Sequence, residues 1–195
     1  PRCEYIPDNP DLNENKNQNM NQVSVKYVRT RIGELILGSY EGKLCLLDFR
    51  YRKMRTAIDN RIRSGLNVEF ILKDDETLER TRKQLDEYLD GTRTRFDIPI
   101  LMVGTDFQKA VWNVLMEVPY GKTASYLDLA IAIDNGNAVR AVAGANGANA
   151  IAMIIPCHRI IGSNGELVGY GGGLAVKKKL LDLEQGHRSL FEDPK

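Results

Sequence analysis

The chain has 195 residues, with 27 Lys and Arg against 26 Asp and Glu, and a net charge of +1 at pH 7. Its 43% hydrophobic content suffices to build a buried core in one large domain or two small ones. No run approaches the roughly 18 apolar residues of a membrane helix, and no charged-then-apolar leader opens the chain. We therefore expect a soluble intracellular protein without a membrane partner, cytoplasmic in a bacterium or nuclear in a eukaryote. The balanced charge neither favours nor excludes nucleic acid, because a DNA-binding face can be local.

Cysteine and histidine are both scarce. Cys3, Cys45 and Cys157 are too few and too scattered for a disulfide framework, which fits a reducing compartment and free thiols. The histidines, His158 and His187, are not accompanied by a Cys-x-x-Cys pair, so a tetrahedral zinc site would lack ligands. We expect neither a metal nor a cofactor.

The first half of the chain predicts a small α/β domain. Residues 1–22, rich in Asn, Asp and Pro, read as a disordered tail or linker, and Met20 is a possible native start. Short β-branched and aromatic runs predict three antiparallel strands, and two amphipathic stretches predict helices. The strands are expected near 23–30, 34–39 and 44–50, and the helices over 53–63 and 76–90, the second ending at Gly91. An extended segment containing Pro99, residues 92–101, then predicts the connection out of a domain that spans 23–103.

The second domain, predicted over 104–188 before a tail at 189–195, opens with a capping box at Thr105–Gln108. The helix that follows has one apolar face, formed by Phe107, Val111, Trp112, Leu115 and Met116. We expect Trp112 to be a core residue.

Two short helices around a turn follow. Ser125 can cap a helix carrying Tyr126, Asp134–Gly136 predicts the turn, and Asn137 can cap a second helix reaching about Asn146. This pattern is typical of a helix-turn-helix motif, although most helical hairpins bind no DNA.

The second of these helices consists mostly of small residues with a single Arg140. Small side chains would let its backbone approach a sugar-phosphate surface in the minor groove, with Arg140 filling the space of an extruded base. In the alternative interpretation, Ala and Gly permit tight packing against a neighbouring helix and Arg140 only caps or pairs.

The pair Cys157-His158 follows the apolar run 151–155, from which Pro156 separates it. A proline at the end of a strand and an adjacent base would hold a thiol in place and take its proton, so Cys157 is a candidate nucleophile. Taken alone, an inert buried cysteine is the commoner case. Lys177–Lys179 predicts a solvated helix face, with a weak phosphate contact as the alternative.

Several motifs together resemble the O6-alkylguanine-DNA alkyltransferases, that is, the methylated-DNA–protein-cysteine methyltransferases. In family order over residues 105–185, they are Val118–Gly121 with Ser125-Tyr126, Ala138–Val142, Pro156–Ile160 and Gly169–Leu174. The resemblance implies a ribonuclease-H-like α/β N-terminal domain and a helical C-terminal domain with a winged helix-turn-helix-like motif.

The resemblance also implies residue roles and a monomer that needs no protein partner. Cys157 matches the alkyl acceptor, His158 the base that deprotonates it through a water, and Glu184 the carboxylate that orients His158. Asn149 matches the hinge asparagine and Tyr126 the proton donor to guanine. Arg140 matches the finger that replaces the flipped base in minor-groove-bound duplex DNA, and Ser125 a phosphate contact. The same helix would contact DNA through Ala141, Gly144 and Ala145, and the substrate pocket would be lined by Ala152, Ile160, Tyr170 and Gly171.

The sequence departs from the commonest pattern of that family at three positions. Ala150 and Ala152 stand where proline often lines the pocket entrance, and Gly171 replaces a frequent serine. Because smaller residues would widen the pocket, we expect bulky O6-benzyl adducts to be accepted.

Three other functions remain open at this point. A module that recognises alkylated bases without repairing them lacks the acceptor cysteine, which is present here. A Cys-His hydrolase would need an oxyanion hole and turnover by water. The segment before Met20 could also join this unit to a regulatory domain.

Overall fold

The computed structural model describes residues 4–5 and 21–186. The predicted tail at 189–195, most of the tail predicted at 1–22, and the side chains Cys3 and His187 lie outside the described residues. Within that tail, β1 (Glu4–Tyr5) pairs with β2, and residues 21 and 22 already belong to β2 (Asn21–Thr30).

The three predicted strands form an antiparallel meander. They are β2, β3 (Gly33–Tyr40) and β4 (Lys43–Phe49), and β3 pairs with both of the others. Burial alternates along the first part of β2, as expected for a strand with one face on the core. The tight turn between β3 and β4 places Glu41 and Gly42 at positive φ, a conformation that suits glycine at the second position.

A fifth strand was not predicted from the sequence. β5 (Val68–Leu72) runs parallel to β2. It pairs with the first half of β2, and β1 pairs with the second half. β5 follows α1 (Arg55–Leu66), so the chain crosses through this helix from β4 at one side of the sheet to the free edge of β2 at the other.

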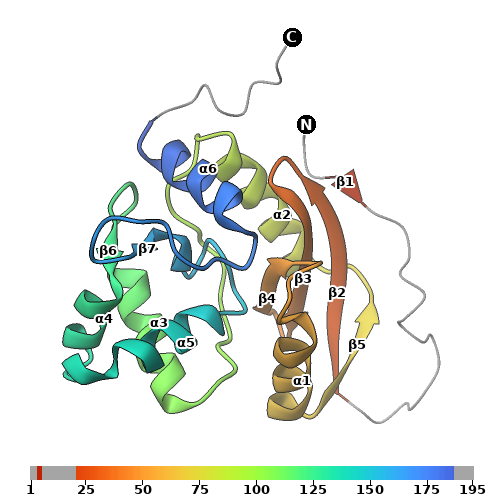
Figure 1. The fold of residues 1–195 in the computed structure, drawn as a ribbon. Helices are drawn as coiled ribbons and strands as arrows, with labels where there is room; N and C mark the ends of the chain where they lie inside the picture. The colour runs from red at the N-terminus through yellow and green to blue at the C-terminus, as the bar shows by residue number, and fades with distance from the viewer. Residues whose placement is uncertain (1–3, 6–20, 187–195) are drawn as a thin grey trace.

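The second predicted helix, α2 (Glu76–Leu89), covers one face of this sheet (Figure 1). Asp75 caps it by accepting a hydrogen bond from the backbone N–H of Leu78, and Gly91 follows at positive φ. Its buried face includes Leu85 and Tyr88.

The second half is mainly helical, as expected. α3 (Asp106–Glu117) begins with the predicted Thr105 capping box and buries Trp112. Phe107 and Met116, which the pattern assigned to the same apolar face, are 36% and 39% exposed because they lie on the flanks of that face.

The helical pair also forms, with one correction. Ser125 caps α4 (Tyr126–Ala132) in a capping box with Asp128, and a short 3-10 turn leads into α5 (Val139–Gly147). The N-cap of α5 is Ala138, without a side-chain bond; the predicted cap, Asn137, lies inside the 3-10 turn.

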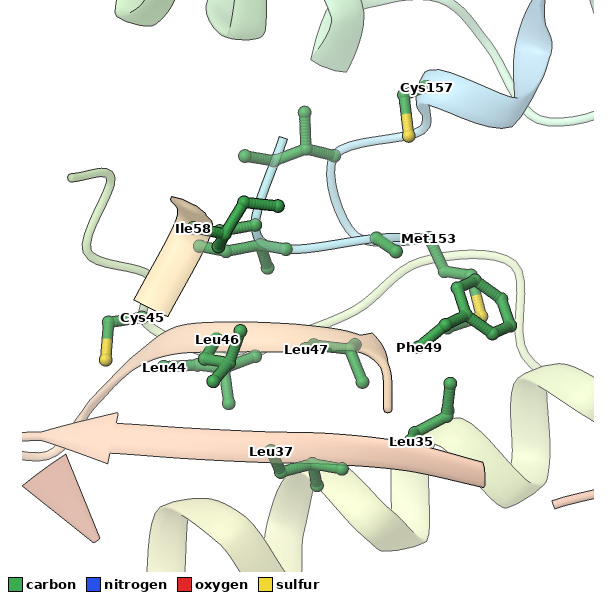
Figure 2. Packing of buried hydrophobic residues seen from close by; sticks show 14 of the residues in the cluster. Leu35, Leu37, Leu44, Cys45, Leu46, Leu47, Phe49, Ile58, Met153 and Cys157 are labelled. Atoms are coloured by element: carbon green, nitrogen blue, oxygen red, sulfur yellow. The ribbon is translucent and has the colours of Figure 1, made fainter. Parts of the chain in front are cut away.

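The apolar run 151–155 is not the strand that was predicted. It makes only isolated bridges, because Met153 has φ +68° and turns the backbone. Leu47 of β4 donates to the Ala150 carbonyl and accepts from the Ala152 N–H, which attaches the run to the sheet. Met153 and Phe49 of β4 belong to the same cluster of buried residues, part of which Figure 2 shows, so one continuous core joins the two halves.

The remaining elements complete the second half. β6 (Ala124–Ser125) pairs in parallel with β7 (Ile160–Ile161), and α6 (Leu174–Glu184) closes the described chain (Figure 1). Within the ranges that the structure describes, no helix is long and apolar enough to cross a membrane.

Candidate active site

Cys157 begins a short 3-10 helix, η2 (Cys157–Arg159), directly after the loop that is attached to β4. The loop is organised by Asn149. Its Oδ1 accepts from the Ile151 N–H at 2.9 Å, and its Nδ2 donates to the Ile155 carbonyl at 2.8 Å and to Cys157 Sγ at 3.2 Å. One buried amide therefore fixes the loop and also faces the thiol.

His158, the residue after Cys157, forms a buried pair with Glu184. The His158 Nε2 and Glu184 Oε1 atoms are 2.8 Å apart, and both side chains are fully buried. Among the described residues, His158 Nδ1 is a buried ring nitrogen without a hydrogen-bond partner. If Nε2 carries the proton that Glu184 accepts, Nδ1 is the basic nitrogen.

Glu184 is held from several sides. Arg159 donates Nε to Oε2 at 2.8 Å and Nη2 to Oε1 at 2.9 Å, a bidentate arrangement that fixes the plane of the carboxylate. The Gly121 N–H donates to Oε2 at 3.1 Å, and the Tyr88 hydroxyl donates to Oε1 at 2.6 Å. The family resemblance indicated Glu184 as the partner of His158, but the sequence analysis missed the contacts of Glu184 with Arg159 and Tyr88.

Burial and charge set the protonation states of these groups. Burial raises the pKa of Cys157, opposed by the Asn149 hydrogen bond and by the charge of Arg52. Burial lowers the pKa of His158, opposed by its bond to Glu184. Burial alone would raise the pKa of Glu184, but hydrogen bonds and charge from His158 and Arg159 lower it to about 2. At neutral pH, a neutral imidazole therefore lies against a carboxylate, and the thiol needs a base to ionise.

A cavity of about 290 Å³ opens over Cys157, near the lower limit for ligand pockets. It lies between both halves of the chain and is lined by Arg52, Lys53, Met54, Tyr126, Ala143, Asn146, Gly147, Cys157, Gly169, Tyr170 and Gly171. Of the predicted pocket residues, Tyr170 and Gly171 line it. Ile160 and Ala152 do not: Ile160 is buried in β7, and Ala152 is bonded to β4.

Arg52 is a pocket residue that the sequence analysis missed. Its Nη1 donates to Asp48 and to the Asn149 carbonyl, both at 2.9 Å, and its Nη2 donates to the Gly147 carbonyl. It therefore joins the first half of the chain to the end of α5. A Cβ built on Gly171 would lie 3.0 Å from its Nε, so the guanidinium occupies the space beside that glycine.

Lys177 corrects a further expectation. The sequence predicted a solvated lysine face, but Lys177 is fully buried and donates to the carbonyls of Ile160 and Val168. Burial lowers its pKa to about 8. The side chain thus attaches α6 to β7, and of the three lysines only Lys178 and Lys179 are exposed.

The α4–α5 pair presents an exposed surface beside the cavity. Arg140, Ala141 and Gly144 are exposed on α5, and a Cβ on Gly144 would meet nothing within 4 Å. Internal packing therefore does not require glycine at that position. Ala145, predicted to contact DNA, is only 3% exposed and accepts a hydrogen bond from Trp112 Nε1 through its carbonyl, so it belongs to the α3–α5 contact.

Two further predicted residues, Ser125 and Tyr126, lie at the start of α4. Tyr126 lines the cavity from the first turn of α4, and burial raises its pKa. Ser125 is half-buried, and its Oγ accepts from the Asp128 N–H at 3.1 Å and donates to Asp128 Oδ2 at 2.8 Å. No group of three His, Cys, Asp or Glu side chains suited to a metal occurs in residues 4–5 and 21–186.

Comparison with known proteins agrees with this geometry. Family models for 6-O-methylguanine DNA methyltransferase match residues 23–102 (ribonuclease-like domain) and 106–186 (DNA-binding domain). The chain is 40% identical over 160 residues to the methylated-DNA–protein-cysteine methyltransferase of Methanosarcina barkeri, covering 82% of this chain and 96% of that protein. It is 48% identical over 124 residues to the inducible enzyme of Bacillus subtilis, covering 64% and 69%.

Solved structures show the same likeness. The Mycobacterium tuberculosis OGT in complex with DNA superposes with a TM-score of 0.72 at 35% identity, covering 87% of this chain and 96% of that one. The O6-methylguanine-DNA methyltransferase of Pyrococcus kodakaraensis gives a TM-score of 0.63 at 25% identity, covering 83% and 98%. The chain therefore belongs to the methylated-DNA–protein-cysteine methyltransferase family.

Proposed function

We propose that this protein repairs DNA by transferring the alkyl group of O6-alkylguanine to the sulfur of Cys157. The observation that carries the proposal is the position of that sulfur. It contacts the Asn149 amide at the floor of a cavity and is followed directly by the buried His158–Glu184 pair. Family membership supports DNA repair by alkyl transfer to a cysteine, and this is the cysteine that the site surrounds with polar groups.

The first step is formation of the thiolate. A thiol whose pKa is raised by burial is mostly protonated at neutral pH, and the thiol is a poor nucleophile. His158 Nδ1 takes the proton through an intervening water, and Glu184 stabilises the imidazolium that results. The Asn149 N–H and the Arg52 charge stabilise the negative sulfur.

The second step is displacement at the alkyl carbon. The sulfur forms a bond to that carbon, the carbon–O6 bond breaks, and its electron pair passes to the guanine. Tyr126 donates its hydroxyl proton to guanine N3, so that guanine leaves as a neutral base, and the proton taken from Cys157 returns to Tyr126 through solvent. Tyr126 suits this role because it lines the cavity, and its raised pKa means that the hydroxyl is protonated at neutral pH.

The product is a thioether on Cys157. A thioether has no exchange reaction that restores the thiol, in contrast to a disulfide. Each molecule of the protein therefore acts once and is consumed.

The protein binds DNA, and we assign the α4–α5 surface to that contact. Exposed Ala141 and Gly144 let the backbone of α5 approach the minor groove, and Arg140 fills the space of the extruded guanine. Ser125 is a weaker candidate for a phosphate contact, because its hydroxyl already serves the α4 cap. We expect a monomer that acts in the compartment holding the DNA.

The test is the intact mass of the protein after incubation with a duplex containing O6-methylguanine. We expect one added methyl group on the wild type and on Cys45→Ala, a matched control at another buried thiol, and none on Cys157→Ala. Peptide mapping should locate the methyl group on Cys157.

Two outcomes would contradict the proposal. Tight binding of the duplex without a mass change would indicate a module that recognises the damage without repairing it. Repeated turnover with release of a free product would indicate a hydrolase.

A further inference from the structure

The Glu184 carboxylate accepts hydrogen bonds from two distant parts of the chain. Gly121, His158 and Arg159 belong to the same half as Glu184, whereas Tyr88 lies on α2, which packs against the sheet of the other half. The 2.6 Å bond from the Tyr88 hydroxyl is the shortest of these contacts.

The same hydroxyl lies 3.3 Å from His158 Nε2. Nε2 must keep its own proton for Glu184 if Nδ1 is to act as the base, so Tyr88 directs its proton to Glu184 Oε1 instead. Tyr88, His158 and Arg159 Nη2 thus all donate to Glu184 Oε1. Burial and the charge of Glu184 raise the pKa of Tyr88 well above its ordinary value, so the hydroxyl is a donor at neutral pH.

We propose that Tyr88 is a positioning residue for the transfer reaction, through which the N-terminal α/β half controls the basicity of His158. A carboxylate oxygen that is shared among several donors attracts the proton on each of them less strongly. The Tyr88 hydroxyl therefore weakens the hold of Glu184 on the imidazolium form and keeps His158 a base that is neutral at physiological pH. This role rests on the proposed function.

The competing explanation is that Tyr88 only fills space. Its ring is fully buried, 5.1 Å from the ring of Phe96 and 6.2 Å from that of Tyr120, measured between centroids. Tyr88→Phe keeps the ring and removes the hydroxyl alone, so it separates the two explanations. Tyr27→Phe is a matched control, because Tyr27 is a buried tyrosine on β2 that contacts Arg50 rather than the site.

The first measurement is the pKa of His158 by NMR with 13C-labelled histidine. The chain has only two histidines, so His187→Gln assigns both signals. The charged and titratable groups that act on His158 are Glu184, Arg159, Lys177, Tyr88, Cys157 and Tyr170. Tyr88→Phe changes one of them, and we expect the His158 pKa to rise by about half to one unit, a typical effect of one hydrogen bond; Tyr27→Phe should leave it unchanged.

The second measurement is the pH profile of the single-turnover methyl transfer rate. The acid limb of Tyr88→Phe should move to higher pH by the same amount as the His158 pKa. A space-filling role would lower the rate or the melting temperature without moving either quantity, and that result would overturn the proposal. If Tyr88→Phe does not fold, 3-fluorotyrosine at position 88, a stronger donor, should lower the His158 pKa, and an unchanged or higher value would overturn the proposal.

The NMR titration does not depend on methyl transfer. A wild type that transfers no methyl group would therefore refute the proposed function, while the control of His158 by Tyr88 would still be tested on its own.

Discussion

Cys45 and Cys157 are both free, buried thiols, yet their surroundings have nothing else in common. Cys45 lies on β4 between Leu44 and Leu46, and its Sγ is 3.5 Å from the Gly38 carbonyl, an acceptor that cannot stabilise a thiolate. Cys157 lies on a separate segment at the far end of the cluster in Figure 2, with a donor amide, a base and a cavity around it.

The comparison shows that burial alone does not turn a cysteine into a nucleophile. Burial raises the pKa of both thiols, that of Cys45 to about 12. In the mechanism that we propose, the reactivity of Cys157 depends instead on polar groups, which are buried at low cost only because they are paired with one another. The polar network is thus the feature that distinguishes the two regions, and it should respond to acid and to substitution where the apolar region does not.

The largest expected effect is loss of stability in acid. The folded protein holds the pKa of His158 below its ordinary 6.5, so the unfolded chain binds a proton there first and stability falls as the pH drops through 6.5. The pKa of Glu184 is lowered from 4.5 to about 2, so its contribution, on the order of 3 kcal/mol, is present above pH 4.5 and lost towards pH 2.

Urea unfolding measured from pH 7.5 to pH 3 checks this expectation. Glu184→Gln should flatten the decline below pH 4.5, whereas Glu117→Gln, at an exposed site that ends α3, should leave it unchanged. Equal slopes in all three proteins would show that the buried pair does not couple stability to pH.

A smaller effect is expected at the thiol itself. Asn149→Ala removes the hydrogen bond to Cys157, and a hydrogen bond to a charged group contributes about 1.5–3 kcal/mol. The rate of methyl transfer should therefore fall roughly tenfold to a hundredfold, and the pH at which Cys157 reacts with iodoacetamide should rise. Asn113→Ala, at an exposed site on α3, is the control. An unchanged reaction pH would remove Asn149 from the chemistry.

The sequence was sufficient wherever neighbours along the chain decide the structure. The strand-forming run of β2, the Thr105 and Ser125 caps and the amphipathic pattern of α2 depend on residues a few positions apart, and these elements formed as predicted. β5 was missed because its short run pairs in parallel with a strand more than 40 positions earlier.

The site was predictable in part, and only through its motifs. Cys157, His158 and Glu184 were singled out from the sequence. Nothing in the sequence indicated that Tyr88 bonds to Glu184 or that Arg52 lines the cavity, because both come from the other half of the chain. The prediction that Lys177 is exposed to solvent was wrong for a related reason. A run of three lysines predicts a solvated face, and only the carbonyls of Ile160 and Val168 explain why the first of them is buried.

The smallest expected effect concerns the free space beside each of the two thiols. A Cβ on Gly38, beside Cys45, would lie 2.9 Å from the Leu46 Cβ, so that region is filled. Beside Cys157, the expected widening of the pocket by Ala150 and Ala152 is wrong, because neither lines the cavity; of the three departures, only Gly171 does.

Gly171→Ala tests whether that glycine decides the size of the adduct. The added methyl group would lie 3.0 Å from Arg52 Nε, and the guanidinium, tied to Asp48 and to the Asn149 carbonyl, yields little. Methyl transfer should stay within about threefold of wild type, while O6-benzyl transfer falls roughly tenfold, the usual discrimination of a pocket by a small apolar group. The rates for both adducts are measured in the same variant, so the methyl transfer rate shows whether the variant is still active with a small group. If both fall equally, Gly171 supports the fold of the loop and the wall of the pocket lies elsewhere.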